Sequence, residues 1–308
     1  MTTCLILGGT GFLGSHLAER LVNRGYGVRV FDSFETGMAN LETIKDKIEI
    51  TKGDFLNHAD VLQALQGVDY VFHYISTTVP ATAVKDPVYD VETNVIATIR
   101  LLQLAVDSNV KRVIFPSSGG TIYGEPSSLP VHETHPLSPI DPYGISKLAI
   151  EKYLHHFNRA YGLDYLVLRY SNPYGERQSP HGQQGVIPVF LNRVKMGERP
   201  VIYGDGSMER DYIYVGDAVK ATITALEKKT AHKIFNIGSG TGTSINGLLE
   251  VMSDVVGKNI EPVYAEDTAV RVQKIVLDTS RIRGEIGWKP RTSLEEGIAT
   301  TWRWITSL

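Results

Sequence analysis

Short apolar runs alternate with longer amphipathic segments along the chain as far as residue 170. The short runs are rich in β-branched and aromatic residues and predict strands, whereas segments with apolar residues three and four positions apart predict helices. The predicted strands are Thr3–Leu7, Val28–Phe31, Ile48–Thr51, Tyr70–Tyr74, Arg112–Phe115 and Tyr165–Leu168. The predicted helices are Leu13–Arg24, Ala59–Leu65, Val91–Ser108 and Tyr143–Tyr161. This alternation predicts an α/β protein with a doubly wound parallel sheet.

The regular alternation ends after Tyr174. Loops rich in Gly, Pro and Gln follow at Gln178–Gly185, and the later elements are more widely spaced along the chain. A length of 308 residues also suits about two domains, at roughly 150 residues each. We therefore predict a first domain over residues 1–173, to which later segments return, and a smaller C-terminal lobe over residues 174–308.

The composition excludes some classes of partner. The chain has 31 Lys and Arg against 34 Asp and Glu, a net charge of −3, so it lacks the basic field that attracts nucleic acid or an anionic membrane. No apolar stretch reaches the roughly 18 residues that a membrane-spanning helix needs. The single cysteine, Cys4, lies in the first apolar run, and no basic residue precedes that run as in a signal peptide. We expect a protein of the cytoplasm.

A glycine-rich turn follows the first predicted strand and opens the first predicted helix. In the segment GGTGFLG, Gly8 would allow a tight bend, Gly11 would let the backbone approach a pyrophosphate, and Gly14 would let helix and strand pack closely. Asp32 ends the second strand, where a carboxylate accepts hydrogen bonds from the adenosine ribose and repels the 2′-phosphate of NADP. Asp54, after the third strand, is a candidate for contact with the adenine. Such a turn can be purely steric, but this context predicts a Rossmann domain that binds NAD.

Tyr143 and Lys147 are the candidate catalytic pair. Four residues apart, they share one face of a predicted helix, and Asp141-Pro142 before them supplies an N-cap and a first helical residue. A free tyrosine, with a pKa of about 10, is a poor base at neutral pH, but a neighbouring ammonium and an oxidised nicotinamide both favour the phenolate. The pair can then take the proton of a sugar hydroxyl while hydride leaves for the cofactor.

Together these motifs resemble the extended short-chain dehydrogenases/reductases, in particular the NAD-dependent sugar-nucleotide epimerase/dehydratase family. The resemblance follows the family's order from residue 8 to residue 290. It rests on GGTGFLG at Gly8, and on Asp32, Gly53-Asp54, Asn94, Ser117-Ser118, Tyr123-Gly124, Tyr143 with Lys147, Arg169–Pro173, Gly206–Tyr212 and Gly287–Pro290. It implies a Rossmann domain that retains NAD, a C-terminal lobe that binds a nucleoside diphosphate sugar, and a homodimer made by the two long predicted helices.

The resemblance also assigns residues to cofactor and substrate. The cofactor-binding residues would be Gly8, Gly11, Phe12, Leu13, Gly14, Asp32, Asp54, Phe55, Asn94, Tyr143, Lys147 and Tyr170. On the substrate side, Asn172 matches an amide that contacts the nucleotide sugar, and Arg210 matches an arginine on the diphosphate. Arg271 is a second candidate for the diphosphate, three residues out of the family's register. No metal is expected, because His132-Glu133-Thr134-His135 lacks the zinc-binding spacing.

The segment Gly119-Gly120-Thr121 bears on the reaction. Dehydratases and decarboxylases that resemble this chain place one or two carboxylates there, and this chain has none. The expected reaction is therefore NAD-dependent inversion at C4 of a nucleotide sugar, of the UDP-glucose and UDP-galactose type, through a transient 4-keto intermediate. A dehydratase or a 4-ketosugar reductase on the same fold, and an inactive NAD-binding sensor, are the alternatives.

Gly119 departs from the family, which places at this position the hydroxyl that partners the catalytic tyrosine. Ser118 and Thr121 are the candidate replacements, and we favour Thr121 because it shares a local register with other members of the family. The alternative is that both hydroxyls only satisfy backbone groups of a turn. Two further features are expected to be structural: His73 as a buried, hydrogen-bonded histidine, and Gly238–Gly242 as a strand-to-helix turn.

Overall fold

The computed structural model describes residues 1–35, 37–182, 184–267 and 272–308. The chain divides into two compact units, each built from three separate stretches of the sequence. Unit 1 is made of Met1–Ser118, Asp141–Leu168 and Ala225–Ile234. Unit 2 is made of Gly119–Ile140, Arg169–Thr224 and Phe235–Leu308.

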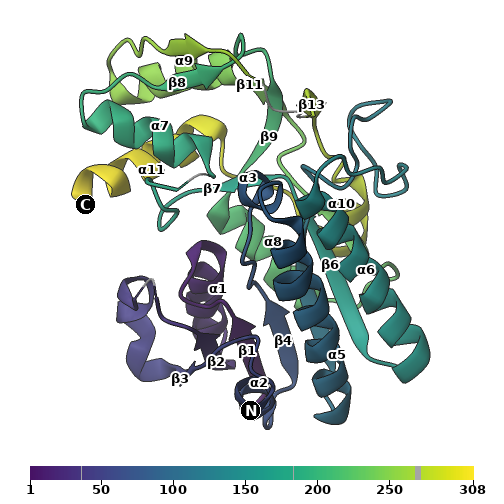
Figure 1. Ribbon diagram of the computed structural model, residues 1–308. Coiled ribbons are helices and arrows are strands. Elements are labelled where there is room, and N and C mark those ends of the chain that lie inside the picture. Colours follow the sequence, from purple (N-terminus) through teal and green to yellow (C-terminus); the bar gives the residue numbers. More distant parts are fainter. Residues whose placement is uncertain (36, 183, 268–271) are drawn as a thin grey trace. The chain divides into compact units, whose positions relative to one another are not determined.

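A seven-stranded sheet forms the centre of unit 1, with the strands in the order β10-β6-β5-β4-β1-β2-β3 (Figure 1). The strands are β1 (Thr3–Leu7), β2 (Gly27–Asp32), β3 (Glu49–Lys52), β4 (Tyr70–His73), β5 (Arg112–Ser118), β6 (Asp164–Tyr170) and β10 (Ile234–Ile237). β1 pairs in parallel with β2 and β4, β2 with β3, and β4 with β5. This is the strand order of a dinucleotide-binding fold, in which ligands bind at the carboxyl ends of the strands, where the order reverses. The predicted doubly wound sheet is confirmed.

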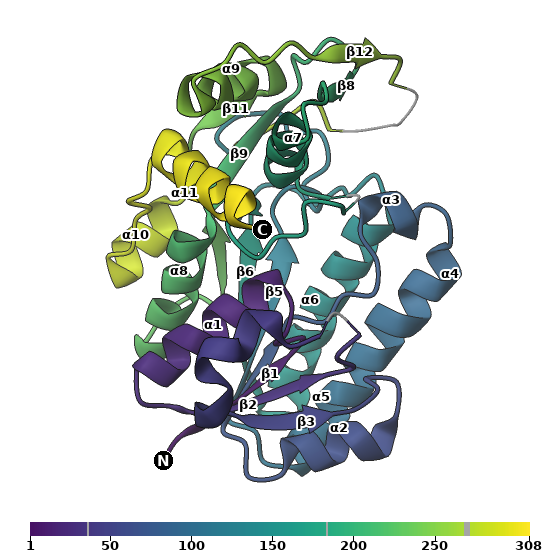
Figure 2. The ribbon, with the colours of Figure 1, turned by 90° about the vertical axis from the view of Figure 1, so that its left-hand side faces the viewer.

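Helices cover both faces of the sheet in unit 1 (Figure 2). α2 (His58–Leu65), α5 (Ala97–Asp107) and α6 (Pro142–Tyr161) lie on one face, and α1 (Phe12–Asn23) lies on the other. The first face holds a large hydrophobic core, to which strands and helices contribute side chains such as Val71, Val113, Phe115, Leu65, Leu101 and Leu154. These helices bury the apolar stripe that their sequence pattern indicated.

The predicted strands and helices are all present, with ends that differ by a few residues. One helix differs in kind, because the segment predicted as Val91–Ser108 begins with a π-helical stretch, η2 (Val91–Ile96), before α5. There the Asn94 side chain donates a hydrogen bond to the Asp90 carbonyl at 3.1 Å, and such side-chain bonds compete with the regular helical ladder. Short helices that the pattern did not indicate are η1 (Ala39–Lys47), α3 (Pro80–Ala83) and α4 (Pro87–Asp90).

Unit 2 is built around β9 (Glu209–Tyr214). β9 pairs in parallel with β7 (Asn172–Tyr174) and β13 (Lys274–Ile275), and antiparallel with β11 (Gly242–Ser244). The remaining elements are β8 (Val201–Tyr203), β12 (Val263–Ala265), α7 (Val186–Lys195), α8 (Val215–Glu227), α9 (Ile245–Val256), α10 (Ser280–Ile286) and α11 (Leu294–Ser307). α11 contacts α7 and α9, and apolar side chains of all three helices form the core of this unit. Within the described ranges, no helix is long and apolar enough to cross a membrane.

Candidate active site

The glycine turn between β1 and α1 requires glycine at two positions for two different reasons. Gly8 has a φ of +82°, a conformation that residues with a side chain rarely adopt. At Gly14, a Cβ atom would lie 2.2 Å from the carbonyl oxygen of Gly8, so a side chain there would push the helix away from the turn. A Cβ at Gly11 would meet only that same oxygen, at 3.4 Å. The backbone at Gly11 is therefore open to the close approach of a ligand.

The first turn of α1 is suited to an anion. Its N-cap is Gly11, no side chain caps the helix, and the first turn carries no acidic residue. The first N–H groups of a helix have no partner within the helix, and they lie at the positive end of its dipole. A dinucleotide pyrophosphate fits these donors.

Asp32, the last residue of β2, is held against the glycine turn by Thr10. Its Oδ2 accepts hydrogen bonds from the backbone N–H of Thr10 at 3.0 Å and from the Thr10 hydroxyl at 2.6 Å. Its Oδ1 accepts one long hydrogen bond, from Phe34 N at 3.4 Å. One carboxylate oxygen is thus fixed by the protein, and the other can accept hydrogen bonds from a ribose.

Tyr143 and Lys147 lie together at the start of α6. The helix begins at Pro142, and the Asp141 side chain caps it by accepting a hydrogen bond from Gly144 N at 2.8 Å, as the sequence predicted. The Lys147 Nζ atom lies 5.3 Å from the centroid of the Tyr143 ring and 4.9 Å from that of Phe115. Within the described residues, the ammonium makes no hydrogen bond or ion pair.

Burial dominates the acid–base properties of this pair. It raises the pKa of Tyr143, the negative charges of Asp141 and Asp90 raise it further, and a hydrogen bond with the Ser76 hydroxyl opposes them. Burial lowers the pKa of Lys147 to about 8, against the negative charge of Asp90, which raises it. At neutral pH the pair is therefore a phenol beside an ammonium, and an additional positive charge would be needed to favour the phenolate.

His73 contacts the Phe115 ring, which Lys147 also approaches, and it is a structural residue. It is 2% exposed, its Nε2 is 2.8 Å from the Thr98 hydroxyl, and its ring packs against Phe55 and Phe115. Burial, with the positive charge of Lys147, lowers its pKa to about 3. With so low a pKa the imidazole has little affinity for a proton, and the burial and hydrogen bond of His73 confirm its structural assignment.

The segment that follows β5 belongs to unit 2 and is tightly packed at Gly119. A Cβ at Gly119 would lie 2.5 Å from Leu277 Cδ1 and 3.1 Å from the Arg169 carbonyl oxygen, so a serine would displace Leu277. Two residues later, the Thr121 hydroxyl oxygen is buried and has no hydrogen-bond partner among the described residues. This observation opposes the idea that Thr121 only satisfies its own turn.

The predicted substrate residues of unit 2 are positioned by β7 and β9. Asn172, the first residue of β7, donates from Nδ2 to the Asp211 carbonyl at 2.9 Å. The Arg210 guanidinium on β9 donates to the carbonyls of Val272 at 2.7 Å and Gln273 at 3.2 Å. The hydroxyl of Tyr170, at the end of β6, is buried against that of Thr222.

Comparison with known proteins identifies the family. A model described as "NAD dependent epimerase/dehydratase family" matches residues 4–238, more than half of the chain. The chain belongs to this family. The resemblance inferred from the motifs is thus confirmed, and NAD is the cofactor, in agreement with the turn at Gly8 and with Asp32.

Members of the epimerase/dehydratase family match the chain over almost all of its length. The UDP-glucose 4-epimerase of Mycolicibacterium smegmatis is 36% identical over 302 residues, 96% of each chain. The crystal structure of a UDP-glucose 4-epimerase with UDP-glucose from Thermotoga maritima is similar with a TM-score of 0.94, 39% identity and 99% coverage of both chains. The UDP-glucose 4-epimerase of Thermus thermophilus, solved with NAD, has a TM-score of 0.91, 34% identity and 99% coverage of both. Similar structures also include a UDP-N-acetylglucosamine 4-epimerase from Methanobrevibacter ruminantium and a dTDP-glucose 4,6-dehydratase from Streptomyces venezuelae.

Other residues assigned to the cofactor by resemblance have structural partners within unit 1. Asp54 is exposed and accepts a hydrogen bond from Leu56 N at 2.9 Å, while the Phe55 ring is part of the core. The Asn94 amide is buried, and its Oδ1 accepts a hydrogen bond from Thr77 N at 3.1 Å. Arg271 lies outside the described residues. Among the residues that are described, no group of three or more His, Cys, Asp or Glu is placed to hold a metal ion.

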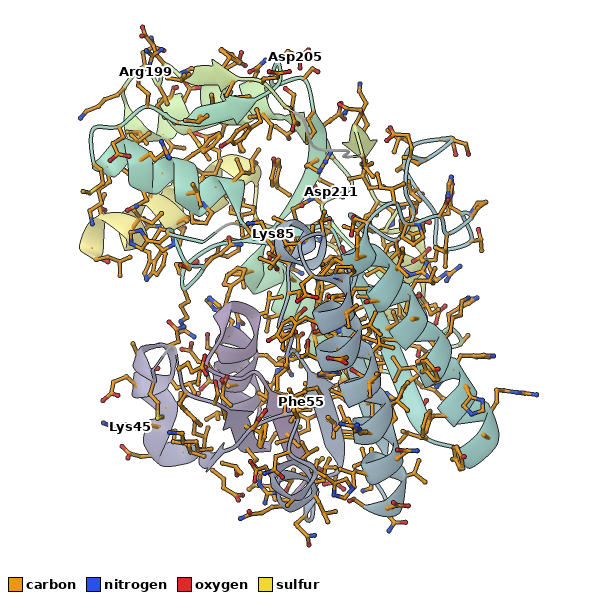
Figure 3. The ribbon with its side chains drawn as sticks, viewed as in Figure 1. Lys45, Phe55, Lys85, Arg199, Asp205 and Asp211 are labelled. Carbon is orange, nitrogen blue, oxygen red and sulfur yellow. The ribbon has the colours of Figure 1, made fainter. Side chains whose placement is uncertain are left out.

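The second glycine-rich segment, Gly238–Gly242, is correctly predicted as structural, but it leads from β10 to the strand β11 rather than directly into a helix. Its N–H groups bind a buried carboxylate of the protein. This carboxylate belongs to Asp211 on β9, which is labelled in Figure 3. Asp211 accepts from Ser239 N at 2.7 Å and Gly240 N at 3.1 Å. The turn therefore anchors β9, the strand that carries Arg210.

Sequence reasoning missed the hydroxyl-rich loop after β4 and the buried acid that holds it. Ser76 bonds with the Tyr143 hydroxyl, and Thr78 donates to Asp90, which also accepts from Ser146. The sequence did contain a clue to the loop, because three hydroxyl residues, Ser-Thr-Thr, follow a predicted strand at the carboxyl edge of a parallel sheet, where ligands bind. The partner Asp90 had no local signal, since only the fold brings it to the loop.

Proposed function

We propose that the chain catalyses inversion at C4 of a UDP-hexose of the glucose and galactose type. The observation that carries this proposal is the Tyr143–Lys147 pair together with a Gly119-Gly120-Thr121 segment that holds no carboxylate. Hydride removal and return need only one acid–base group, whereas loss of water or of carbon dioxide beside a ketone requires further acid–base groups. Relatives named UDP-glucose 4-epimerase support this assignment.

The residues of unit 1 fit NAD as follows. The N–H groups of Phe12 and Leu13 would hold the pyrophosphate, which the open backbone at Gly11 lets approach. Oδ1 of Asp32 would accept a hydrogen bond from a ribose hydroxyl, while the charge of Asp32 disfavours a 2′-phosphate. Bound NAD supplies the acceptor, and later the donor, of the hydride exchanged at the sugar. The family resemblance adds Gly8, Gly14, Asp54, Phe55, Asn94 and Tyr170 to the cofactor-binding set.

Tyr143 would hold and move the proton of the sugar's O4 hydroxyl. Its phenolate oxygen takes that proton as the alcohol becomes a ketone, and the same group returns it when the alcohol re-forms. The Lys147 ammonium, close to the ring, stabilises the phenolate by its positive charge and has hydrogen-bond donors to offer to the cofactor. Because both half-reactions use the same group, the residue ends each turnover in its starting state.

The residues of unit 2 would bind the nucleotide sugar. We assign to Thr121 the hydroxyl that hydrogen-bonds the substrate, because its oxygen is buried without a partner among the described residues; Ser118 remains the alternative. Asn172 would contact the nucleotide sugar, and the forked guanidinium of Arg210 suits a diphosphate. From the family resemblance we also propose that Arg271 binds the diphosphate.

Product analysis tests the proposed function directly. The protein, without added cofactor, is incubated with UDP-glucose deuterated at C4, and the products are resolved by NMR. Conversion to UDP-galactose with deuterium retained at C4, and without net NADH, is expected. A 4-keto-6-deoxy sugar would indicate a dehydratase, net consumption of NAD(P)H a reductase, and the absence of any conversion of a panel of UDP-sugars a binding protein.

We also propose a homodimer and a place in the cytoplasm. Exposed apolar side chains gather on neighbouring elements of unit 1, with Val88 on α4 66% exposed, Ile96 on η2 39% and Ile145 on α6 54%. A second copy of the chain would cover them, as the family resemblance implies for the two long helices.

The location in the cytoplasm is proposed from the cysteine content. Cys4, the one cysteine of the sequence, is buried, and burial raises its pKa to about 12. A protein that relies on no disulfide suits a reducing compartment.

A further inference from the structure

Asp90 is a buried acid that the proposed reaction does not use directly. It ends α4, is 1% exposed, and is surrounded by neutral donors. Its Oδ1 accepts hydrogen bonds from the Thr78 hydroxyl and from Asn94 Nδ2, the latter at 3.2 Å, and its Oδ2 accepts one from the Ser146 hydroxyl. Within the described part of the chain, no cationic side chain forms an ion pair with it.

These hydrogen bonds connect two segments that meet at Tyr143. Ser146 lies on α6 between Tyr143 and Lys147, so a bond to its side chain fixes the turn that carries the catalytic pair. Thr78 lies on the loop after β4, where the Ser76 hydroxyl donates to the Thr78 carbonyl at 3.0 Å and bonds with the Tyr143 hydroxyl. Asp90 therefore bridges the helix and the loop that together hold the phenol.

The hydrogen bonds of Asp90 do not by themselves explain why a carboxylic acid occupies this position. Burying a charge without an ionic partner is costly. The burial of Lys147 is costly in the same way, since its ammonium makes no hydrogen bond within the described residues. Asp90 and Lys147 carry opposite charges in one low-dielectric region, so each reduces the cost of burying the other.

We propose that Asp90 is a positioning residue of the active site, whose carboxyl group ties the Tyr143–Lys147 turn to the Ser76–Thr78 loop and whose negative charge stabilises the buried Lys147 ammonium. The inference rests on the proposed function only in calling the pair catalytic. In agreement with it, the Asp90 charge raises the pKa of Lys147 against the effect of burial.

The other titratable groups around the pair differ from Asp90. His73 is neutral at physiological pH, so it brings no charge to the pair. The Lys147 charge instead lowers the pKa of His73. The Asp141 charge raises the pKa of Tyr143, whereas the pKa of Lys147 is set by burial and by Asp90. Glu151, one helical turn beyond Lys147, is buried and accepts a hydrogen bond from the Ser117 hydroxyl at 2.6 Å. Asp90 is the charge that acts on both members of the pair.

The charge is tested with Asp90→Asn, which preserves the shape of the side chain. The pKa of Lys147 is measured by carbon-13 NMR on protein labelled at lysine Cε, with the signal assigned by Lys147→Arg, and compared with the pH dependence of kcat. The pKa of Lys147 should fall below its value of about 8, and the alkaline limb of kcat should move to lower pH with it. An unchanged Lys147 pKa would overturn the electrostatic part of the proposal.

Two matched variants test whether the loss of any nearby negative charge would change the pKa of Lys147. Asp86→Asn removes a charge from the same short helix at an exposed N-cap, where Asn caps as well as Asp, and should leave the Lys147 pKa unchanged. Asp141→Asn keeps the cap of α6 and should also leave Lys147 unchanged. Because NMR needs no turnover, the two proposals can fail separately. If the Lys147 pKa shifts in Asp90→Asn but the unmodified protein epimerises no UDP-sugar, the proposed function is refuted and this inference stands.

The bridge is tested with Ser146→Ala, which keeps the Asp90 charge and suits a helix. The kcat should fall on the order of tenfold, because the phenol is less well held, with KM and the Lys147 pKa nearly unchanged. Lys152→Ala, an exposed change on the same helix, is the control. A Ser146→Ala variant with the kcat of the unmodified protein would refute the bridge, and this test stands even where Asp90→Asn fails to fold.

Discussion

Replacement of Thr121 by Val should make the protein more stable and less active. The Thr121 hydroxyl is buried without a partner among the described residues, and Val has the same shape with a methyl group in its place. Burying an unpaired hydroxyl costs roughly 1–3 kcal/mol, and that cost disappears in the variant. For a chain of this size, the gain corresponds to a Tm higher by roughly 2–6 °C. A function that requires a free hydroxyl would account for the persistence of this cost.

The same substitution should lower kcat on the order of 10²-fold, the usual loss when one donor to a reacting oxygen is removed. Tm is measured by calorimetry in the absence of substrate, and kcat with UDP-glucose under saturating conditions. Thr121→Ser, which keeps the hydroxyl, should retain most of the activity, and Ser118→Ala should reduce it only mildly. A Thr121→Val protein with lower stability and normal kcat would show that the hydroxyl has a structural partner and no role with substrate.

Three further outcomes are expected. Tyr143→Phe should lower kcat on the order of 10²-fold or more while NAD stays bound, and near-normal turnover would reject the phenol as the acid–base group. Gly14→Ala should abolish retention of NAD, as shown by analysis of the nucleotide released on denaturation, because its Cβ would lie 2.2 Å from the Gly8 carbonyl oxygen. Gly119→Ser should lower the free energy of unfolding by about 1–3 kcal/mol through its clash with Leu277, without raising kcat; a stable variant with higher kcat would contradict the packing argument.

The sequence by itself determined those features that depend on neighbours along the chain. Strand and helix periods, the need for glycine at Gly8, the cap at Asp141 and the placement of Tyr143 and Lys147 on one helical face all arise from residues within about one helical turn of each other. Local geometry is set by backbone dihedrals and short-range hydrogen bonds, which the identity of adjacent residues largely decides. The family's motifs are of this kind, which is why they could be recognised before the fold was known.

The tertiary structure alone decided what depends on distant residues. A side chain at Gly119 would collide with Leu277, and Ser146 donates a hydrogen bond to Asp90, 56 positions away in the sequence. No local pattern indicates either contact. The pKa of Lys147 falls to about 8 because packing removes water from the ammonium. This effect cannot be predicted from the spacing between Tyr143 and Lys147 in the sequence. Burial and long-range hydrogen bonds are properties of the packed chain, and they convert a Tyr–Lys spacing that is common on helices into a pair with altered acidity.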